Sequence, residues 1–499
     1  MDKPGIRYVS RRRQLRAKSA LTAGFDIRQG RLSPVIRPLR GNQAGLRRKR
    51  SSAWLPKRPP IVQSICPFAG RQPLTKKIVI ATIGSLGDLH PFVAIGAALQ
   101  ELGANVVMAV PSSHLSKVEG AGLKAHPIMP DFSAVQNELG MSEAEAAQRV
   151  MTDPDFLIRQ IILNSLPATT RALDHIAAGA DMMVGSLFAL SADIVSQKRG
   201  IPFAVCLLQP LAFQSALDPP RTPDFRMMFK YPARGLARSW NMVWRDLIAR
   251  EMKRRYAVPI NAVRLEHGLP RLKNAPVFDI ESEGALRLAL FSSLLAPDDP
   301  AVVAGAHFTG FPIFDSHTGQ REPVDREVDE FLATGTPPIV FTLGSFAVFA
   351  PGSFYQRSAE ACRSLGRRAI FLTGKPGEAQ TTETVLTRAY LPHSQVFPQC
   401  AAIVHHGGIG TTGQAMMSGR TQVVVPHMGD QWDNGHRLER LGIARVLPAS
   451  EYSSDRARDV LDDLLSCEAT ACRAENVARQ VKTENGAAEA AKLILSTFR

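Results

Sequence analysis

The chain of 499 residues is long enough for two or three domains, and 45% of its residues are hydrophobic. The mean hydropathy is -0.06. No run approaches the roughly 18 apolar residues that a membrane-spanning helix needs. These values predict a globular chain that does not span a membrane.

The net charge of +15 belongs to residues 1–75, which hold 18 Lys and Arg against two acids. Residues 76–499 hold 42 Lys and Arg against 43 Asp and Glu, so the balance gives no support for a nucleic-acid partner.

Residues 1–75 are rich in Arg, Pro, Gly and Ser without sustained periodicity, and we expect them to be disordered. Three interpretations stay open for this tail: a misassigned start or dispensable extension, a targeting peptide, or a polybasic tether to anionic lipid at a membrane surface. The six cysteines form no CxxC pair, and no Cys or His spacing is typical of a metal site. Together with the absence of a secretory signal, this favours reduced thiols in the cytoplasm.

The folded part is expected to open with an alternating strand and helix pattern. Residues 76–83 form a continuous apolar run, as in a central parallel strand, and a Gly-rich turn follows. Pro91 is expected to begin a helix that Gly103 closes, and residues 104–111 read as the next strand. This is a βαβ unit, and further alternation to about residue 208 predicts a Rossmann-like domain.

The alternation breaks between Gln209 and Ala275, which reads as an irregular-to-helical insertion rich in Phe, Met and Trp. These side chains are either ordinary packing or the wall of a pocket for a lipophilic molecule, since such pockets are mostly apolar. A polar, Pro- and Gly-punctuated linker follows at residues 312–325. A second domain is then expected to open with a strand at residues 337–345.

The stretch from Ala401 to Asn434 carries the strongest local pattern. A short apolar strand leads into the turn HHGGIGTT, a helix, and the strand TQVVVP. A helix that begins at a Gly-rich turn presents free backbone N–H groups and the positive end of its dipole, which makes an anion site. Gly407, Gly408 and Gly410 would let the backbone approach a phosphate, and His406 and the threonine hydroxyls would add donors. Without a lysine, this diphosphate site is not a Walker P-loop.

This segment resembles the donor-binding signature of the GT-B, nucleotide-sugar-dependent glycosyltransferases, the UDP-glycosyltransferase superfamily. HHGG-x-GTT, a strand ending in Val-Pro and D-Q-x-x-N stand here in the family's order. The resemblance covers about residues 76–499. It implies two Rossmann-like doubly wound domains facing across a cleft, an acceptor-binding domain at 76–320 and a nucleotide-sugar-binding domain at 325–480. It also implies that a last helix, within 481–499, crosses back onto the first domain.

The resemblance further implies which residues hold the donor. His406, Gly408, Gly410 and Thr411 would contact the diphosphate, whereas His405 is expected to pack or cap locally. Gly344 and Ser345 resemble a second phosphate-contacting turn. The remaining donor residues would be Asp430, Gln431 and Asn434 for the sugar, Gln414 for the ribose, and Tyr390 and His393 for the base.

A general base is needed to activate an acceptor hydroxyl. The turn GSLGDLHPF resembles the G-S-x-G-D-x-x-P-F turn of sterol glucosyltransferases, glycopeptide glycosyltransferases and the rhamnolipid rhamnosyltransferase. In that group Asp88 would be the base, and His90 is the rival because other relatives place a histidine near this turn. A purely structural alternative is that Asp88 caps the N-terminus of a helix.

The resemblance thus implies an inverting, metal-independent glycosyltransferase without a cofactor, which uses a UDP- or dTDP-sugar. It would move a hexose or deoxyhexose to a lipophilic hydroxyl acceptor. A UDP-sugar epimerase of the same fold and a non-catalytic nucleotide-sugar-binding protein are the alternatives. The sequence leaves the sugar, the acceptor and the oligomeric state open.

Overall fold

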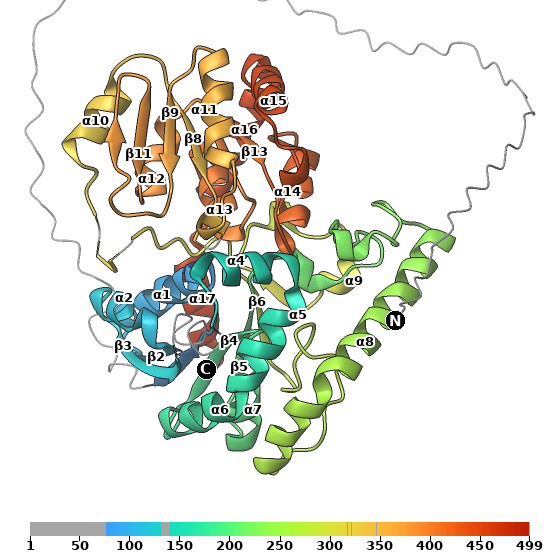
Figure 1. The fold of residues 1–499 in the computed structure, drawn as a ribbon. Coiled ribbons are helices and arrows are strands. Elements are labelled where there is room, and N and C mark those ends of the chain that lie inside the picture. Colours follow the sequence, from blue (N-terminus) through green and yellow to red (C-terminus); the bar gives the residue numbers. More distant parts are fainter. Residues whose placement is uncertain (1–75, 131–139, 317, 321, 346, 499) are drawn as a thin grey trace, which may run out of the picture. The chain divides into compact units, whose positions relative to one another are not determined.

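The computed structural model describes residues 76–130, 140–316, 318–320, 322–345 and 347–498. They form two seven-stranded sheets (Figure 1). The first sheet has the order β3-β2-β1-β4-β5-β6-β7, and all its strands are parallel. Its strands are β1 (Lys77–Ala81), β2 (Asn105–Pro111), β3 (Lys124–Met129), β4 (Met182–Ser186), β5 (Phe203–Leu207), β6 (Leu286–Ala289) and β7 (Ala306–Phe308).

The second sheet repeats this winding in the order β10-β11-β9-β8-β12-β13-β14, with only the edge strand β10 antiparallel. Sequence reasoning passed over the β10–β11 hairpin. The strands are β8 (Ile339–Thr342), β9 (Ala369–Leu372), β10 (Gln380–Thr381), β11 (Val385–Arg388), β12 (Ala402–His405), β13 (Thr421–Val424) and β14 (Ala444–Val446). The predicted pair of doubly wound, Rossmann-like sheets is confirmed.

Helices cover both faces of each sheet, which explains why the central strands are apolar throughout. In β1, Ile78 and Ile80 pack under one layer of helices, and Val79 and Ala81 pack under the other. The helices that accompany the first sheet are α1 (Leu86–Glu101), α2 (Leu115–Gly120), α4 (Glu143–Thr152), α5 (Pro154–Phe156) with a π-helical continuation (Leu157–Leu163), α6 (Asn164–Ile176), α7 (Leu190–Arg199), α8 (Leu236–Glu266) and α9 (Pro300–Val303).

The second sheet is covered in the same way, and the last helix returns to the first sheet. Ala490, Ala491 and Ile494 join the core that β1 and α1 share, so α17 lies beside α1 (Figure 1). The helices that follow the linker are α10 (Arg326–Ala333), α11 (Phe354–Ser364), α12 (His393–Val396), α13 (Ile409–Ser418), α14 (Asp430–Arg440), α15 (Ser454–Ser466), α16 (Glu468–Val481) and α17 (Gly486–Ser496).

The expected start of the first helix is wrong. Helix α1 begins at Leu86, five residues before Pro91, which lies inside the helix. The backbone N–H of Ser85 donates to the carboxylate of Asp88 (3.0 Å), and this capping interaction starts the helix earlier than the proline does. Pro91 removes one helical N–H donor, a cost that the buried packing of α1 outweighs. Asp88 therefore belongs to the first turn of a helix.

The segment between Gln209 and Ala275 is more regular than expected, because 31 of its residues form the single helix α8. No helix within the described ranges is both long enough and apolar enough to cross a membrane. The basic residues 1–75, for which disorder was expected, lie outside the described residues.

A buried ionic network holds α14 against the loop after β5. The carboxylate of Asp218 accepts from Arg437 (3.1 Å) and from Arg440 (2.9 Å), and Asp433 accepts from Arg437 (2.8 Å). Asp433 also accepts from the backbone N–H of Arg221 (3.0 Å). A buried ion pair is stable only when its polar groups are satisfied in this way. The network fixes the position of α14, whose first residue is Asp430.

Candidate active site

The Gly-rich turn joins the carboxyl end of β12 to the N-terminus of α13. Gly408 is the N-terminal cap of α13 and supplies no side-chain cap, so the first-turn N–H groups have no partner from that residue. The turn lies at the point where the strand order of the second sheet reverses, between β8 and β12. Ligands of doubly wound sheets bind at such switch points, and free N–H groups at a helix N-terminus favour an anion.

His406 is held between two glycine-containing turns. A Cβ atom at Gly408 would lie 2.4 Å from His406 Nε2, and one at Gly344 would lie 2.3 Å from His406 Cε1. Gly344 also has a φ of 69°, which a side chain rarely adopts. Both glycines are therefore needed to seat the imidazole. The structure thus brings the turn at Gly344 together with the turn after β12, and the contact of Gly344 and Ser345 with a phosphate stays a prediction.

The imidazole of His406 is neutral. Burial, helped by the neighbouring imidazoles of His405 and His427, lowers the pKa of His406 well below its usual value. A positively charged ring is disfavoured at this position, because burial penalises the protonated form. Its Nδ1 atom is buried without a hydrogen-bond partner among the described residues. A neutral ring with an unused nitrogen is suited to hydrogen-bond a ligand.

His405 is fully buried and, unlike His406, has hydrogen-bond partners for both ring nitrogens. Its Nδ1 accepts the backbone N–H of Gly407 (3.2 Å), so its Nε2 carries the proton and donates to Gln422 Oε1 (3.0 Å). Burial lowers the pKa of His405 to about 4, so the ring is neutral near pH 7 and carries a single proton. The prediction that His405 packs and caps locally is confirmed.

Unsatisfied polar atoms gather around the same turn. Besides His406 Nδ1, the buried atoms Thr412 Oγ1, Gln414 Oε1 and Asn434 Oδ1 make no hydrogen bond to any described residue. Leaving a buried polar atom unpaired costs about 1–3 kcal/mol, so such a concentration at one place is characteristic of a ligand site. Thr411 and Gly410 are partly exposed on the first turn of α13.

The start of α14 lies against the Gly-rich turn through Asn434. Its amide nitrogen donates to the carbonyl of Gly407 (2.9 Å) and to Asp430 Oδ2 (2.8 Å). Gln431 Oε1 accepts hydrogen bonds from the backbone N–H groups of His427 (2.8 Å) and Met428 (3.1 Å). This oxygen therefore stabilises the loop that precedes α14. Of the Gln431 amide, only the nitrogen is left for a ligand.

Asp430 is a carboxyl group with a raised pKa. Burial is the main cause and raises the pKa of Asp430 to about 7. The negative charge of Asp88 also raises this pKa, whereas the hydrogen bond from Asn434 lowers it. Asp88 lies in α1 and Asp430 in α14, so the fold brings together two carboxylates that are 342 residues apart in the chain. The pKa of Asp88 is itself raised by burial to about 6, against hydrogen bonds from Ser85.

Asp430→Asn is expected to stabilise the protein more at pH 8 than at pH 5. Because the folded-state pKa of Asp430 lies above the usual aspartate value of about 3.8, the native state binds the extra proton, and the free energy of unfolding falls as the pH rises from about 4 to 7. Asparagine removes this loss, on the order of 2 kcal/mol, and still accepts from Asn434. Thermal unfolding of the variant and the wild type at both pH values measures this difference in stability. Asp462→Asn, at an exposed position of α15, is the control. A pH-independent difference for Asp430→Asn would contradict the raised pKa of Asp430.

Asp88 packs directly on Gly84. A Cβ atom at Gly84 would lie 1.9 Å from Asp88 Oδ2, so only glycine leaves room for the carboxylate in this position. The expected capping role of Asp88 is thus present, because one carboxylate oxygen accepts the backbone N–H of Ser85 (3.0 Å). A carboxylate has about four acceptor sites, so capping by Ser85 leaves acceptor capacity for chemistry and the two interpretations of Asp88 are compatible.

His90 is a poor base in this structure. Its Nε2 lies 3.4 Å from Lys117 Nζ, and its ring meets Phe314 edge-on. Burial, with a contribution from the positive charge of Lys117, lowers the pKa of His90 to about 3. A general base works best with a pKa near the operating pH, which favours Asp88 over His90.

Tyr390 and His393 lie together, with ring centroids 5.9 Å apart in a stacked arrangement. The hydroxyl of Tyr390 donates to Asp315 (2.8 Å), as do the backbone N–H groups of His393 (3.1 Å) and Ser394 (2.7 Å). Asp315 stands in the segment read as a polar linker, so sequence reasoning missed it. Its only signal was a lone Asp in a Pro- and Gly-punctuated stretch. The assignment of Tyr390 and His393 to a nucleobase stays a prediction.

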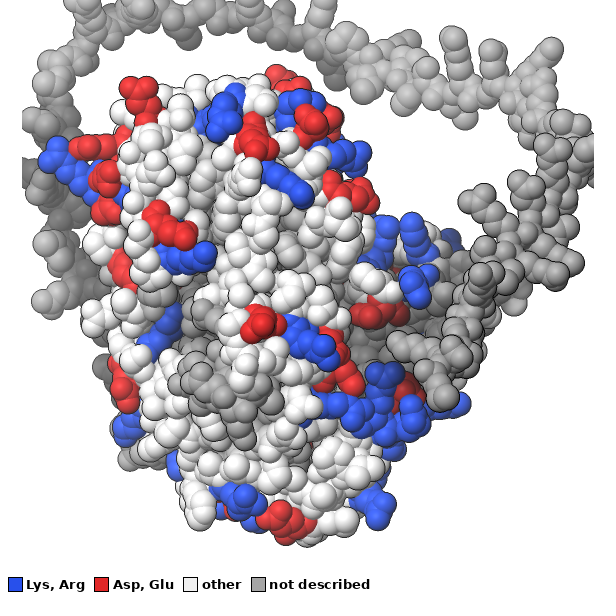
Figure 2. Space-filling model, in the orientation of Figure 1, with Lys and Arg blue, Asp and Glu red and all other residues white. Residues whose placement is uncertain are grey.

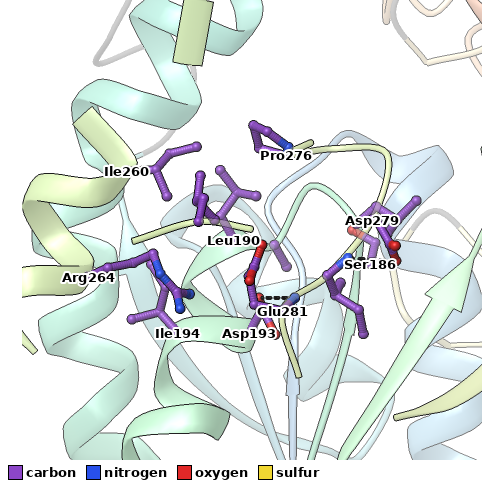
Figure 3. Close-up of a pocket in the computed structure, with 13 residues that line it drawn as sticks. Ser186, Leu190, Asp193, Ile194, Ile260, Arg264, Pro276, Asp279 and Glu281 are labelled. Carbon is purple, nitrogen blue, oxygen red and sulfur yellow. Dashed lines mark hydrogen bonds between the residues drawn. The ribbon is translucent and has the colours of Figure 1, made fainter. Parts of the chain in front are cut away.

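A small cavity of about 20 Å³ lies beside the insertion where an acceptor pocket was one interpretation (Figure 3). Ser186 at the end of β4, Asp193 in α7 and Arg264 in α8 line it. This volume holds about one water molecule, and the buried Arg264 Nη1 has no partner among the described residues. The cavity is too small for an acceptor.

The aromatic and methionine side chains of the insertion divide into two groups. Phe213 packs with Phe291 and Phe308, and Phe225 is buried, as ordinary packing predicts. Met227, Phe229 and others are exposed. Among the described residues, no three His, Cys, Asp or Glu side chains are grouped so that they could hold a metal ion.

Comparison with known proteins agrees with this geometry. Residues 78–206 match the glycosyltransferase family 28 N-terminal domain, and residues 372–496 match the C-terminal domain of erythromycin biosynthesis protein CIII-like proteins. An uncharacterized glycosyltransferase of Mycobacterium leprae is 28% identical over 429 residues, 84% of this chain and 96% of that protein. The O-mycaminosyltylonolide 6-deoxyallosyltransferase of Streptomyces fradiae is 28% identical over 438 residues, which again cover 84% and 96%.

Solved structures share the fold. The glycotransferase of kitacinnamycin superposes with a TM-score of 0.63 at 20% identity, over 86% of this chain and all of that one. The glycosyltransferase VinC in complex with dTDP gives a TM-score of 0.59 at 18% identity, over 84% and 98%. The fold is GT-B, with two Rossmann-like sheets of the order described above. The chain is a GT-B glycosyltransferase.

Proposed function

We propose that this enzyme transfers a hexose or deoxyhexose from a UDP- or dTDP-sugar to a hydroxyl group of a lipophilic small molecule or lipid, with inversion at the anomeric carbon. One observation carries the proposal. Neutral His406 is seated between Gly344 and Gly408 at the N-terminus of α13, with its Nδ1 atom unpaired. Such a site supplies hydrogen-bond donors to a diphosphate without a lysine.

The donor would bind through several parts of the second sheet. The first-turn N–H groups of α13, the hydroxyl of Thr411 and His406 would hold the diphosphate, with Gly344 and Ser345 at its other side. Gln414, whose Oε1 is unpaired, would accept from the ribose, and Tyr390 and His393 would contact the base. The bound dTDP in the VinC structure supports a nucleoside diphosphate of this kind.

The sugar would lie near Asp430, which accepts hydroxyl hydrogen bonds as a carboxylate, and near the free amide nitrogen of Gln431. Asn434 would act by positioning, since its amide holds Asp430 and Gly407 together. Burial raises the pKa of Asp430, as expected of a carboxylate that has lost its contact with water and would regain hydrogen bonds from the sugar hydroxyls.

In the transfer step, Asp88 takes the proton of the acceptor hydroxyl while that oxygen bonds to the anomeric carbon. The bond from the anomeric carbon to the diphosphate oxygen breaks on the opposite face, and the electron pair leaves with the diphosphate. Direct displacement of this kind inverts the anomeric centre. The negative charge that develops on the leaving group is stabilised by the donors at the start of α13, with no metal ion required.

The class of acceptor is supported by the relatives' names. O-mycaminosyltylonolide and the vancomycin aglycone are the acceptors in the names of two similar enzymes, and both are natural products. A UDP-sugar epimerase and a non-catalytic binding protein would share the donor site. A non-catalytic protein needs no base facing the sugar, whereas Asp88 lies close enough to Asp430 for its charge to raise the pKa of Asp430. An epimerase would leave the sugar on the nucleotide, whereas the names of the relatives support transfer to an acceptor.

Calorimetric titration of the full chain with UDP, dTDP, UDP-glucose and dTDP-rhamnose tests the donor site. We expect one nucleotide series to bind and His406→Ala to lose that binding. Binding that survives in His406→Ala would show that the diphosphate sits elsewhere, and binding by none of the four would remove the basis of the proposal.

Gly84→Ala is expected to reduce transfer on the order of 100-fold without changing donor affinity. The added Cβ would lie 1.9 Å from Asp88 Oδ2 and displace the carboxylate. Gly87→Ala is the matched control, because a Cβ there meets nothing closer than Ser85 Oγ at 3.7 Å. Steady-state rates with donor binding in parallel measure both variants. Equal rates in the two variants would show that the position of Asp88 does not matter for catalysis.

A further inference from the structure

Exposed apolar side chains are concentrated in one part of the surface. Of the ten large hydrophobic side chains that are exposed among the described residues, nine lie between Met227 and Leu265, in α8 and the loop before it. Single exposed hydrophobics are normal on a protein, whereas a contiguous group marks an interaction surface. Leu236, at the start of α8, is 89% exposed.

The residues fall on one face of α8. Leu236, Trp240, Val243 and Leu247 follow one another at intervals of four, three and four residues, which is the spacing of a single helix face. The preceding loop extends this face, because Trp240 Nε1 donates to the carbonyl of Met227 (2.8 Å) and its ring meets Phe229 at 6.4 Å. We call these six residues the α8 patch: Met227, Phe229, Leu236, Trp240, Val243 and Leu247.

The α8 patch is held in place from behind. Asn241 is the only buried residue of α8 before Tyr256. Its side chain accepts the backbone N–H of Phe229 (2.8 Å) and donates to the carbonyls of Ala216 and Phe229 (both 3.0 Å). The loop and the helix are thereby joined on the inner side, so the apolar side chains on the outer side belong to a fixed surface. Figure 1 shows α8 as a long helix along the edge of the first sheet's domain.

Cations surround the α8 patch. Residues 226–255 contain nine Lys and Arg but only two acids, Asp246 and Glu251, and both acids are paired with arginines. Five of the cations have no ion pair or side-chain hydrogen bond to any described residue: Arg226, Lys230, Arg234, Arg238 and Arg250. Figure 2 shows Lys and Arg gathered over the part of the surface where Figure 1 draws α8. The near-neutral balance of residues 76–499 concealed this local excess.

We propose that the α8 patch docks the enzyme on a membrane surface that contains anionic phospholipid. An apolar helix face that includes Trp, flanked by Lys and Arg, is the arrangement of helices that lie in the interface of a bilayer. The unpaired cations supply the charge complementarity, since each Lys or Arg near an anionic surface is attracted to it. A second copy of this chain fits worse, because two such faces would bring like charges together.

Cosedimentation of the full chain with vesicles tests this proposal. The vesicles are phosphatidylcholine alone or phosphatidylcholine with phosphatidylglycerol, and we expect binding to the anionic vesicles only. Leu236→Gln/Val243→Gln removes apolar area at exposed positions, and Arg234→Glu/Arg238→Glu reverses two unpaired charges. Each pair is expected to weaken binding about tenfold or more.

Matched controls separate this surface from general charge and hydrophobicity. Leu102→Gln removes another exposed apolar side chain, and Arg363→Glu/Lys482→Glu reverses two exposed cations on α11 and after α16. These variants should bind as the unaltered chain does. Since residues 1–75 hold 18 further Lys and Arg, patch variants that bind anionic vesicles normally would assign the binding to those residues and overturn the proposal.

Hydrogen exchange with and without vesicles locates the contact. We expect protection of peptides from residues 226–247 that appears with anionic vesicles. Protection of the same peptides that instead grows with protein concentration, without vesicles, would mean that a second copy covers the patch. Protection elsewhere alone would equally contradict the assignment.

Discussion

Asp88→Asn should reduce glycosyl transfer by a factor of about 10² to 10⁴, the usual contribution of a general base. The amide cannot take a proton from the acceptor hydroxyl, yet it can still accept the backbone N–H of Ser85 and start α1. Donor affinity should therefore stay nearly unchanged. Turnover at saturating acceptor, measured beside the nucleotide dissociation constant, separates the two effects.

The pH profile adds a second test of Asp88. Because burial raises the pKa of Asp88 to about 6, the carboxylate is available above that pH, and the wild-type rate should fall as the pH drops through 6. Glu145→Gln is the matched control, since Glu145 accepts the N–H of Ser142 (2.8 Å) at the same position of α4. A comparable loss of rate in Glu145→Gln, or equal loss of donor binding and rate in Asp88→Asn, would show that capping explains the effect.

His406→Ala should lose both donor binding and rate, with about 10² to 10³ of the rate attributable to lost stabilisation of the leaving diphosphate. Its Nδ1 has no partner among the described residues, so the folded protein loses no hydrogen bond there. The variant should unfold near the wild-type temperature. His406→Gln, which keeps a donor, should recover part of the binding.

His405→Ala provides the contrast, because the two adjacent histidines differ in their hydrogen-bond partners. His405 is fully buried and makes hydrogen bonds to Gly407 and Gln422, so its removal should cost about 3 kcal/mol of unfolding free energy. Its folded fraction should still bind nucleotide. Melting temperature and nucleotide titration on both variants give the comparison, and a strongly destabilised His406→Ala would contradict the division of roles.

The strand pattern of both sheets was predictable because parallel strands covered on both faces are apolar throughout, as in residues 77–81. The Gly-rich turn was predictable for a similar reason. The position of His406 leaves no room for a Cβ at Gly408, so the turn requires glycine there and the sequence shows it. His405 and His406 differ only in burial and partners, and the family motif rather than composition distinguished them.

Other features depend on tertiary contacts that no local pattern carries. The start of α1 at Leu86 is an exception, because the bond between Ser85 and Asp88, three residues apart, is a local capping pattern to which the prediction gave less weight than to Pro91. The low pKa of His90 depends on burial and on the charge of Lys117, 27 residues away. The orientation of Gln431 depends on the loop at His427. Both of these features require knowing which residues meet in space.

The surface of α8 was hidden for a different reason. Its aromatic and methionine residues were visible in the sequence, but burial decides whether such residues form a core or a surface. The net charge of residues 76–499 also concealed the excess of Lys and Arg around α8, because acidic residues elsewhere balance it. Local charge along an exposed helix is more informative than the charge of the whole domain.

The most direct test is a transfer assay. Wild-type enzyme is incubated with the donor chosen by titration, a panel of lipophilic hydroxylated acceptors and a chelator, and the products are followed by mass spectrometry and anomeric NMR. The proposed function predicts that an acceptor gains the mass of one sugar with inverted configuration, unaffected by the chelator and absent in Asp88→Asn. An epimerised nucleotide sugar, a retained anomeric configuration, or an unaltered donor across the panel would contradict it.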